Sequence, residues 1–293
     1  MIRILLLFAL LAVHLTAGEW PEHYIVAEDS RSPDGRYGIL IRSNEDDGLP
    51  FDEDAWEATL KTNYIADFQA HSVVARVNNA YYAQGANHRN LEVRWAPDAS
   101  WCLAIYEARF GIFSVQLLLP SRNGVEQVAL GELVVQACSE KVPDAELSFD
   151  CRQTSLGRLV VCSSGTNNPK GFEDRQTRYV CFRGSFDLAT RHWLKAEAKE
   201  VTIAEYEAVS MQEVKVQEVS ENEMPQEMAE RLDERLNRVY RALRVFLPRE
   251  SFNVLRQEQR VWLSETEKVK EVETRNQRVE ARVVELERRF WSF

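Results

Sequence analysis

The sequence predicts an α+β protein of two domains, in which an antiparallel β-rich domain precedes an α-helical hairpin with a long last helix. Short runs of Val, Ile, Tyr and Phe, broken by Gly, Pro, Asn and Asp, predict strands from Glu19 to about Val201. Apolar residues at steps of three and four between Arg231 and Phe290 predict helices. We therefore expect a β-rich domain over residues 19–205, a linker over 206–225 and a helical domain over 226–293.

Residues 1–18 have the layout of a secretory signal peptide. Arg3 precedes an apolar run over residues 4–15, and small residues follow at Thr16-Ala17-Gly18. The run is shorter than the about 20 apolar residues that a transmembrane helix needs, although an uncleaved anchor is the alternative. No later stretch is apolar enough to span a membrane, and we expect a secreted or periplasmic protein.

The β-rich region contains a turn that recurs along the chain. Ser32-Pro33-Asp34-Gly35 leads into an apolar run, residues 96–105 repeat the pattern, and residues 155–161 give a weaker echo. The stretch from Trp95 to Ile105 resembles the inner-strand motif of β-propeller blades. Because about four blades of ~40 to 45 residues would fit and the repeat offset suits that period badly, we expect an antiparallel sandwich or a partial propeller.

The distribution of charge along the chain limits the kinds of partner that the protein can bind. The net charge is -10, and residues 221–293 contain equal numbers of acidic and basic side chains, so the acidic excess lies in the first 220 residues. Nucleic acid is not an expected partner, since phosphate binding needs clustered Lys and Arg.

Five cysteines lie in the β-rich part. Cys162 and Cys181, in two strand-like runs, are the candidate disulfide, worth about 3 kcal/mol if unstrained. Cys102 is expected to be buried.

No catalytic, cofactor or metal signature stands out. The carboxylates of residues 44–54 crowd one loop, but their spacing does not match a calcium loop, and we expect no bound metal. The sequence lacks a nucleophile elbow, a phosphate loop and a zinc-hydrolase motif. His88 is the histidine placed most suggestively, before a strand, and it is expected to be a turn residue. We therefore expect a protein that is not an enzyme and carries no cofactor.

The apolar pattern of the last 60 or so residues predicts two helices hinged at Leu247-Pro248. No glycine or proline interrupts residues 249–290, which predicts one long helix of about 60 Å. Steps of three at residues 266, 269 and 272 mark a stammer in the pattern. A helix this long would extend beyond its partner and pack on the β domain or on a second copy of the chain. Homo-oligomerisation through this helix is therefore a hypothesis, which light scattering would test.

The residues that fill this pattern resemble the helical domain named after the lysozyme inhibitor LprI, over about residues 226–289. The matching positions are Leu236, Asn237 and Tyr240 in the first helix and Leu255, Gln259 and Trp262 in the second, with a weaker match at residues 282–286. The family's flanking cysteines are missing, and Ser264-Glu265-Thr266-Glu267 replaces its Arg-Asp pair. The resemblance implies a protein that binds and inhibits lysozyme, here without a disulfide brace.

The spacing of the matching positions supports two roles. Leu255, Gln259 and Trp262 share one helical face, and Gln259 could bond across the hairpin to Asn237 or Tyr240. Such a polar clamp would fix the hairpin, whereas direct contact with a partner is the alternative. We expect an exported, non-enzymatic binding protein of the cell envelope with a protein partner such as a lysozyme-like hydrolase. The alternatives are an assembly protein that oligomerises through the long helix and, less favoured, an envelope hydrolase.

Overall fold

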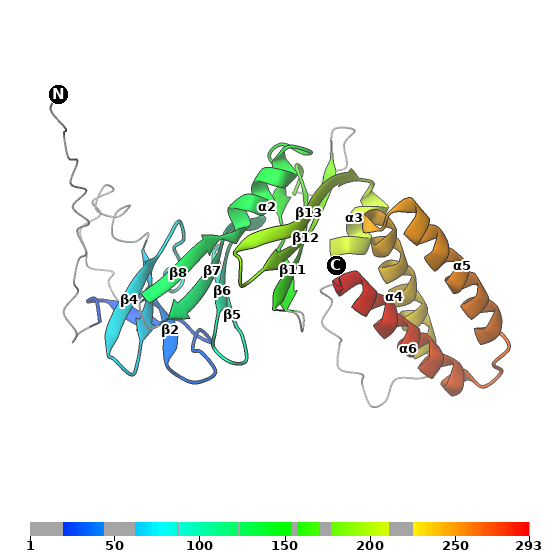
Figure 1. Ribbon diagram of the computed structural model, residues 1–293, viewed down its shortest axis with the longest axis horizontal. Helices are drawn as coiled ribbons and strands as arrows, with labels where there is room; N and C mark the ends of the chain where they lie inside the picture. Colours follow the sequence, from blue (N-terminus) through cyan, green and yellow to red (C-terminus); the bar gives the residue numbers. More distant parts are fainter. Residues whose placement is uncertain are drawn as a thin grey trace, which may run out of the picture. The chain divides into compact units, whose positions relative to one another are not determined.

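The computed structural model describes residues 20–43, 62–86, 88–121, 124–153, 157–169, 177–210 and 225–292. Antiparallel sheets in the N-terminal part and helices in the C-terminal part confirm the predicted α+β class (Figure 1). The chain forms two compact units. The first comprises residues 1–109 and 113–130, and the second comprises residues 110–112 and 131–293. This division differs from the boundaries expected near residues 205 and 226, because the third sheet groups with the helices.

Two sheets belong mainly to the first unit, and each follows chain order. The first sheet contains β1 (Tyr24–Val26), β2 (Tyr37–Arg42), β3 (Asn63–Asp67) and β4 (Ser72–Val77). The second contains β5 (Asn90–Trp95), β6 (Cys102–Ala108), β7 (Gly111–Ser121) and β8 (Gly124–Ala129). Side chains of both sheets form one core: Ala27, Ile39, Ile41, Ile65, Val77, Ala80, Cys102, Ala104, Tyr106 and Leu118. Cys102 is fully buried there, as expected from the sequence.

The third sheet belongs to the second unit. Its strands are β9 (Glu146–Leu147), β10 (Asp150–Gln153), β11 (Arg158–Thr166), β12 (Tyr179–Asp187) and β13 (His192–Val201). The order is β10-β11-β12-β13, and β9 also pairs with β11. Among the described residues, two helices were not expected from the sequence: α2 (Leu130–Ser139) and α3 (Ile203–Ser210). Helix α3 begins three residues before the expected linker and covers its first residues, 206–210, while residues 211–224 lie outside the described residues.

The recurring turn occupies the same place in successive sheets, before the second strand. The amide of Ser32 donates to the carbonyl of Tyr37 at 2.9 Å, and the amide of Ala96 donates to that of Trp101 at 2.9 Å. In the first copy Asp34 accepts a hydrogen bond from the amide two residues later, at 3.1 Å, and the equivalent aspartate of the second copy does the same. The sequence echo therefore reflects a repeated four-stranded meander.

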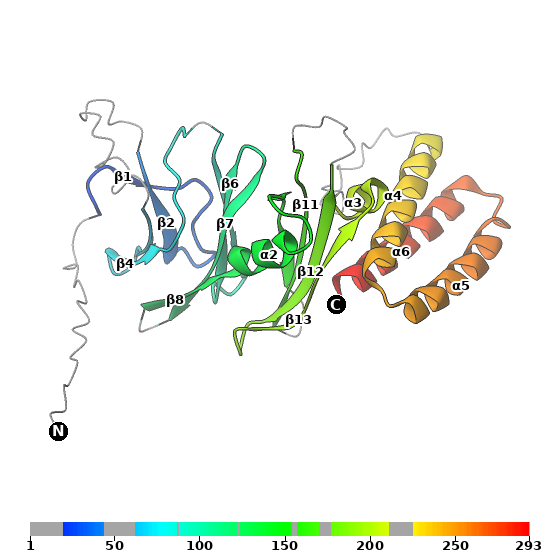
Figure 2. The same ribbon diagram turned by 90° about the horizontal axis from the view of Figure 1, so that it is seen from above.

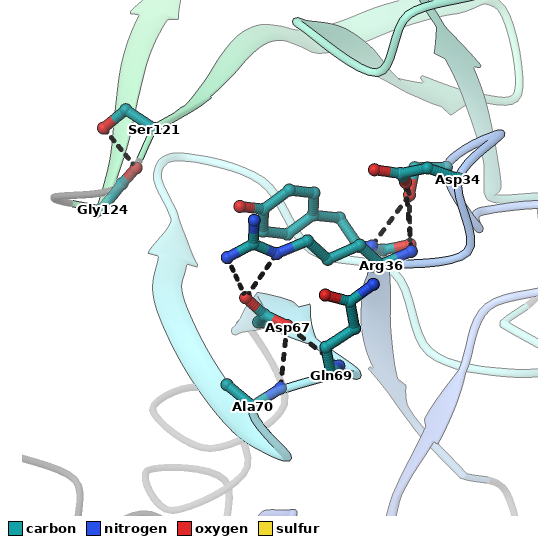
Figure 3. Close-up of polar contacts among 9 residues, drawn as sticks. Asp34, Arg36, Asp67, Gln69, Ala70, Ser121 and Gly124 are labelled. Carbon is teal, nitrogen blue, oxygen red and sulfur yellow. Dashed lines mark hydrogen bonds and ion pairs between the residues drawn. The ribbon is translucent and has the colours of Figure 1, made fainter.

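A second turn is closed by the carboxylate of Asp67 (Figure 3). Its Oδ2 accepts hydrogen bonds from Arg36, at 2.9 Å from Nε and 2.8 Å from Nη2. Its Oδ1 accepts the amides of Gln69 at 2.9 Å and Ala70 at 3.0 Å. Burial acts to raise the pKa of Asp67, but the Arg36 and amide hydrogen bonds outweigh it and hold this pKa below its usual range. Asp187 closes the equivalent turn of the third sheet.

Three helices complete the second unit: α4 (Pro225–Phe246), α5 (Arg249–Thr266) and α6 (Val272–Trp291) (Figure 2). Helix α4 ends before Leu247-Pro248, which confirms the expected hinge, and α6 is the long last helix. None of the helices in the described part of the chain is long and apolar enough to cross a membrane.

The uninterrupted helix expected over residues 249–290 is wrong, because the chain leaves the helical conformation between Thr266 and Val272. Glu271 precedes α6 and Glu273 lies in its first turn, where negative charges suit the helix dipole, whereas the last turn of α5 contains no basic residue. The Glu271 carboxylate also accepts a hydrogen bond from the hydroxyl of Thr274 at 2.7 Å. The break coincides with the stammer and lets α6 run back along α4.

The third sheet and the helices share a second core. Its buried members are Val160, Cys162, Cys181, Ala208, Val209, Leu232, Leu236, Val239, Ala242, Leu243, Val245, Phe246, Leu255, Val279, Val283, Leu286, Phe290 and Trp291. Cys162 lies opposite Arg183 and Cys181 lies opposite Ser164, so the two cysteines are diagonal neighbours. Both are free thiols in the structure, and the expected disulfide between them is not formed. Burial raises the pKa of both thiols, which keeps them protonated.

Two cations of the third sheet reach the C-terminal ends of two helices. Arg183 is 1% exposed, and its guanidinium donates to the carbonyl of Phe290 in α6 and lies 4.8 Å from the ring of that residue. Burial lowers the pKa of Arg183 to about 10, so the side chain stays charged at neutral pH. Lys199 donates to the carbonyl of Val245 in α4 at 2.8 Å. Both contacts satisfy terminal carbonyls and oppose the negative end of a helix dipole.

Candidate binding surface

The positions that carry the family resemblance divide into buried and accessible residues. Leu236, Leu255 and Gln259 are 5%, 2% and 7% exposed, and the two leucines belong to the second core. Asn237 is exposed, whereas Tyr240 and Trp262 are partly buried. The buried positions therefore hold the helices together, and the accessible ones remain available to a partner.

Gln259 forms a polar clamp, but its partner differs from the expected one. Its Oε1 accepts a hydrogen bond from Nε of Arg282 at 3.0 Å, and both side chains are buried. The sequence predicted Asn237 or Tyr240 as the partner. The prediction was wrong because it assumed that Gln259 faced the first helix of a hairpin, whereas the break after α5 brings α6 against this face.

Ion pairs extend this clamp and hold α5 and α4 on α6. Arg289 pairs with Glu258 of α5 at 2.7 Å and with Glu285 at 2.7 Å. The pKa of Glu285 is lowered, since the hydrogen bonds and charges of its arginine partners outweigh the opposing effect of burial. On the other side of α6, Arg235 of α4 forms two hydrogen bonds with Glu287, at 2.8 and 2.7 Å. Fork-like pairs of this kind fix the relative positions of helices.

Tyr240, one of the accessible positions, lies where α4 contacts α5. The ring of Tyr240 contacts the ring of Phe252, with centroids 5.2 Å apart and an interplanar angle of 48°. Phe252 is partly buried against the second core, as is Trp262 farther along α5. The aromatic neighbour of Tyr240 is therefore Phe252, which is not one of the positions that carry the family resemblance.

Three arginines surround this aromatic pair. Arg244 follows Tyr240 by one helical turn, and Arg256 and Arg260 follow Phe252 by one and two turns. All three are exposed. We name the set of Tyr240, Phe252, Arg244, Arg256 and Arg260 the arginine surface.

The electrostatics of Tyr240 agree with this arrangement. Burial raises the pKa of its phenol above the usual value, and the positive charges of the three arginines lower it in part. Among the described residues, no carboxylate is a cause of this shift. The phenol therefore remains neutral near physiological pH and can donate a hydrogen bond to an anion.

These arginines belong to the group of helix arginines that have no carboxylate partner among the described residues, which also includes Arg241, Arg249, Arg275, Arg278 and Arg288. Arg235, Arg282 and Arg289 each pair with a carboxylate. Within the residues that the structure describes, the three arginines of the arginine surface form no ion pair. No sequence motif singles these arginines out, although the four-residue steps from Phe252 to Arg256 and Arg260 place them on one helical face.

The rest of the described chain offers less chemistry. His23, His71 and His88 occupy turns with positive φ, as expected for His88. No group of three or more His, Cys, Asp or Glu side chains suited to a metal occurs among the described residues. A shallow pocket lies beside Ser148, Asp150 and Trp291. The acidic loop of residues 44–54 lies outside the described residues, so its expected lack of metal stays a prediction.

The fold and the arginine surface define a β-sheet protein with a three-helix module whose exposed face suits binding. Residues 210–286 match the model of the lysozyme inhibitor LprI family. The match covers about a quarter of the chain and confirms the resemblance seen in the helical segment. Neither a curated protein nor a solved structure matches the chain.

Proposed function

We propose that this chain is an exported, non-enzymatic binding protein of the cell envelope that inhibits a lysozyme-like hydrolase through its helices. The observation that carries the proposal is the family match over residues 210–286, which includes α4, α5 and most of α6. The apolar leader of residues 1–18 supports export. The lack of recognisable catalytic motifs supports a role in binding.

The helices are suited to this role because their arrangement is rigid. The Gln259–Arg282 hydrogen bond and the Glu258–Arg289 ion pair fasten α5 to α6 without any disulfide. Binding groups on rigid helices lose little entropy when a partner docks. The missing cysteines of the family pattern are thus compensated by buried and partly buried polar contacts.

Self-assembly through a long helix has weaker support. That alternative depended on a helix that extends beyond its neighbours and needs another chain to cover it. In the structure α6 instead packs along α4, and its end is buried against the third sheet of the same unit. Binding of a different protein is therefore the function that the geometry favours.

An inhibition assay tests the proposal. The full chain is exported from its own leader, purified and added to a c-type lysozyme that is clearing a suspension of bacterial cell walls. We expect the clearing rate to fall with increasing protein and to be largely lost at micromolar concentration. An unrelated protein of equal net charge, at about 150 mM salt, controls for non-specific attraction. Full lysozyme activity at micromolar protein would contradict the proposed function.

A further inference from the structure

We propose that the arginine surface is the docking site for the carboxylate-lined active-site cleft of a lysozyme-type glycoside hydrolase. The inference rests on the proposed function and adds which residues make the contact and which groups of the enzyme they meet. The docking face is the one between α4 and α5. It is not the α5–α6 face, where Gln259 and Glu258 form their contacts with α6.

The charge of the surface gives the first argument. Arg244, Arg256 and Arg260 are exposed and have no carboxylate partner among the described residues, although the chain as a whole is acidic. Keeping three guanidinium groups together costs electrostatic energy when no anion neutralises them. A partner that supplies carboxylates would relieve this repulsion, and the planar guanidinium suits paired contacts with them.

The geometry gives the second argument. The contact between the rings of Tyr240 and Phe252 brings the two helices together at this face. Arg244 extends the α4 side by one turn, and Arg256 and Arg260 extend the α5 side by two. Arginine and tyrosine beside an aromatic ring are the residue types that contribute most to protein interfaces.

The chemistry of the partner gives the third argument. Glycoside hydrolases of the lysozyme type work with two carboxyl groups on either side of the scissile bond, at the base of a cleft. Clustered carboxylates between low-dielectric walls concentrate negative potential, which attracts guanidinium groups. An arginine placed there would pair with the groups that act as acid and nucleophile, and inhibition would follow from binding.

A pair of charge-reversal variants tests the inference in the full chain. Arg256→Glu/Arg260→Glu changes two exposed residues of the arginine surface. Arg275→Glu/Arg278→Glu makes the same charge change at two exposed residues of α6 and is the matched control. Affinity for c-type lysozyme is measured by biolayer interferometry, and circular dichroism checks that each variant keeps its helices. We expect the first variant to bind at least ~tenfold more weakly and the control to bind within about twofold of the original chain.

A second arm uses a lysozyme whose two catalytic carboxylates are converted to amides. We expect the original chain to bind this enzyme at least ~tenfold more weakly, because the groups that pair with the arginines have lost their charge. Unchanged affinity of the Arg256→Glu/Arg260→Glu variant, equal loss in the control, or equal affinity for the amide enzyme would overturn the inference. Light scattering that shows a dimer for the original chain and a monomer for the Arg256→Glu/Arg260→Glu variant would assign the surface to a second copy of the chain. That result would also overturn the inference. An original chain that does not bind lysozyme overturns the proposed function itself.

Discussion

Asp67 shows how one carboxylate can couple stability to pH. It is 5% exposed and accepts hydrogen bonds from Arg36 and from two backbone amides of the β3–β4 turn. Its pKa lies lower in the folded chain than in the unfolded chain, where a value of about 3.9 is expected. Its stabilising contribution is therefore fully present above about pH 4 and is lost as the pH falls through the folded-state value.

The variant Asp67→Asn tests this coupling. We expect it to lower the free energy of unfolding of the first unit by about 1 to 3 kcal/mol at pH 7, because the arginine loses its charged partner. The difference from the original chain should shrink as the pH falls below about 4. Urea unfolding followed by tryptophan fluorescence at a series of pH values measures it. A difference that stays constant down to about pH 2 would contradict the assignment.

At the scale of single residues, the sequence was informative about burial and poor at naming partners. Leu236, Leu255 and Gln259 were expected on inward-facing positions, and all three are buried. The partner of Gln259 could not be foreseen, since Arg282 is 23 residues away and meets it only because the chain breaks between them. Periodicity reports which face of a helix is covered, but it does not report which element covers it.

At the scale of elements, the attachment of α5 depends on its polar clamp. The variant Gln259→Ala would leave Nε of Arg282 buried without its acceptor, which costs about 1 to 3 kcal/mol. We expect amide hydrogen exchange in α5 to accelerate more than exchange in α4. The variant Gln257→Ala, at an exposed position of the same helix, is the control and should change neither rate. Equal exchange in both variants would show that the clamp contributes nothing to docking.

The helix break shows what a sequence pattern can conceal. Glycine and proline are the strongest breakers, and their absence from residues 249–290 favoured one continuous helix. The signals that were present were weaker: the stammer at residues 266–272 and the change from lysine to glutamate between Lys270 and Glu271. Packing of α6 on α4 and on the sheet then outweighed the cost of ending one helix and starting another. Helices α2 and α3 were missed for a related reason, because short apolar runs do not distinguish helix from strand.

At the scale of the whole molecule, Phe290 joins the helices to the third sheet. It is fully buried, lies 6.1 Å from the ring of Phe246 and accepts a hydrogen bond from Arg183 through its carbonyl. We expect Phe290→Ala to lower the free energy of unfolding of the second unit by about 3 to 5 kcal/mol. The variant Val284→Ala, at a position 43% exposed on the same helix, should cost less than about 0.5 kcal/mol. Urea unfolding followed by circular dichroism at helical wavelengths compares the two, and similar midpoints would contradict this role.

The α+β class and the repeated turn could be predicted from the sequence. The packing of the third sheet with the helices could not. The echoes at Ser32 and Ala96 predicted related turns, and hydrogen bonds at both positions agree. That the third sheet would share a core with the helices depends on contacts between residues far apart in the chain, such as Arg183 with Phe290. Local patterns carry no information about such pairings.

Because Arg183 and Lys199 bind carbonyls at the helix ends, the docking of the helices depends on the register of the strands that carry these two cations. Arg183 and Lys199 lie on neighbouring strands and on the same face of the sheet, as the pairing of Cys181 with Lys199 requires. A slip of β13 by one residue would turn Lys199 to the opposite face and leave the carbonyl of Val245 without its donor. The helices would therefore dock only on a sheet whose strands are in the correct register. A sheet with a shifted β13 would remain without its helices until the strand had paired again in the native register.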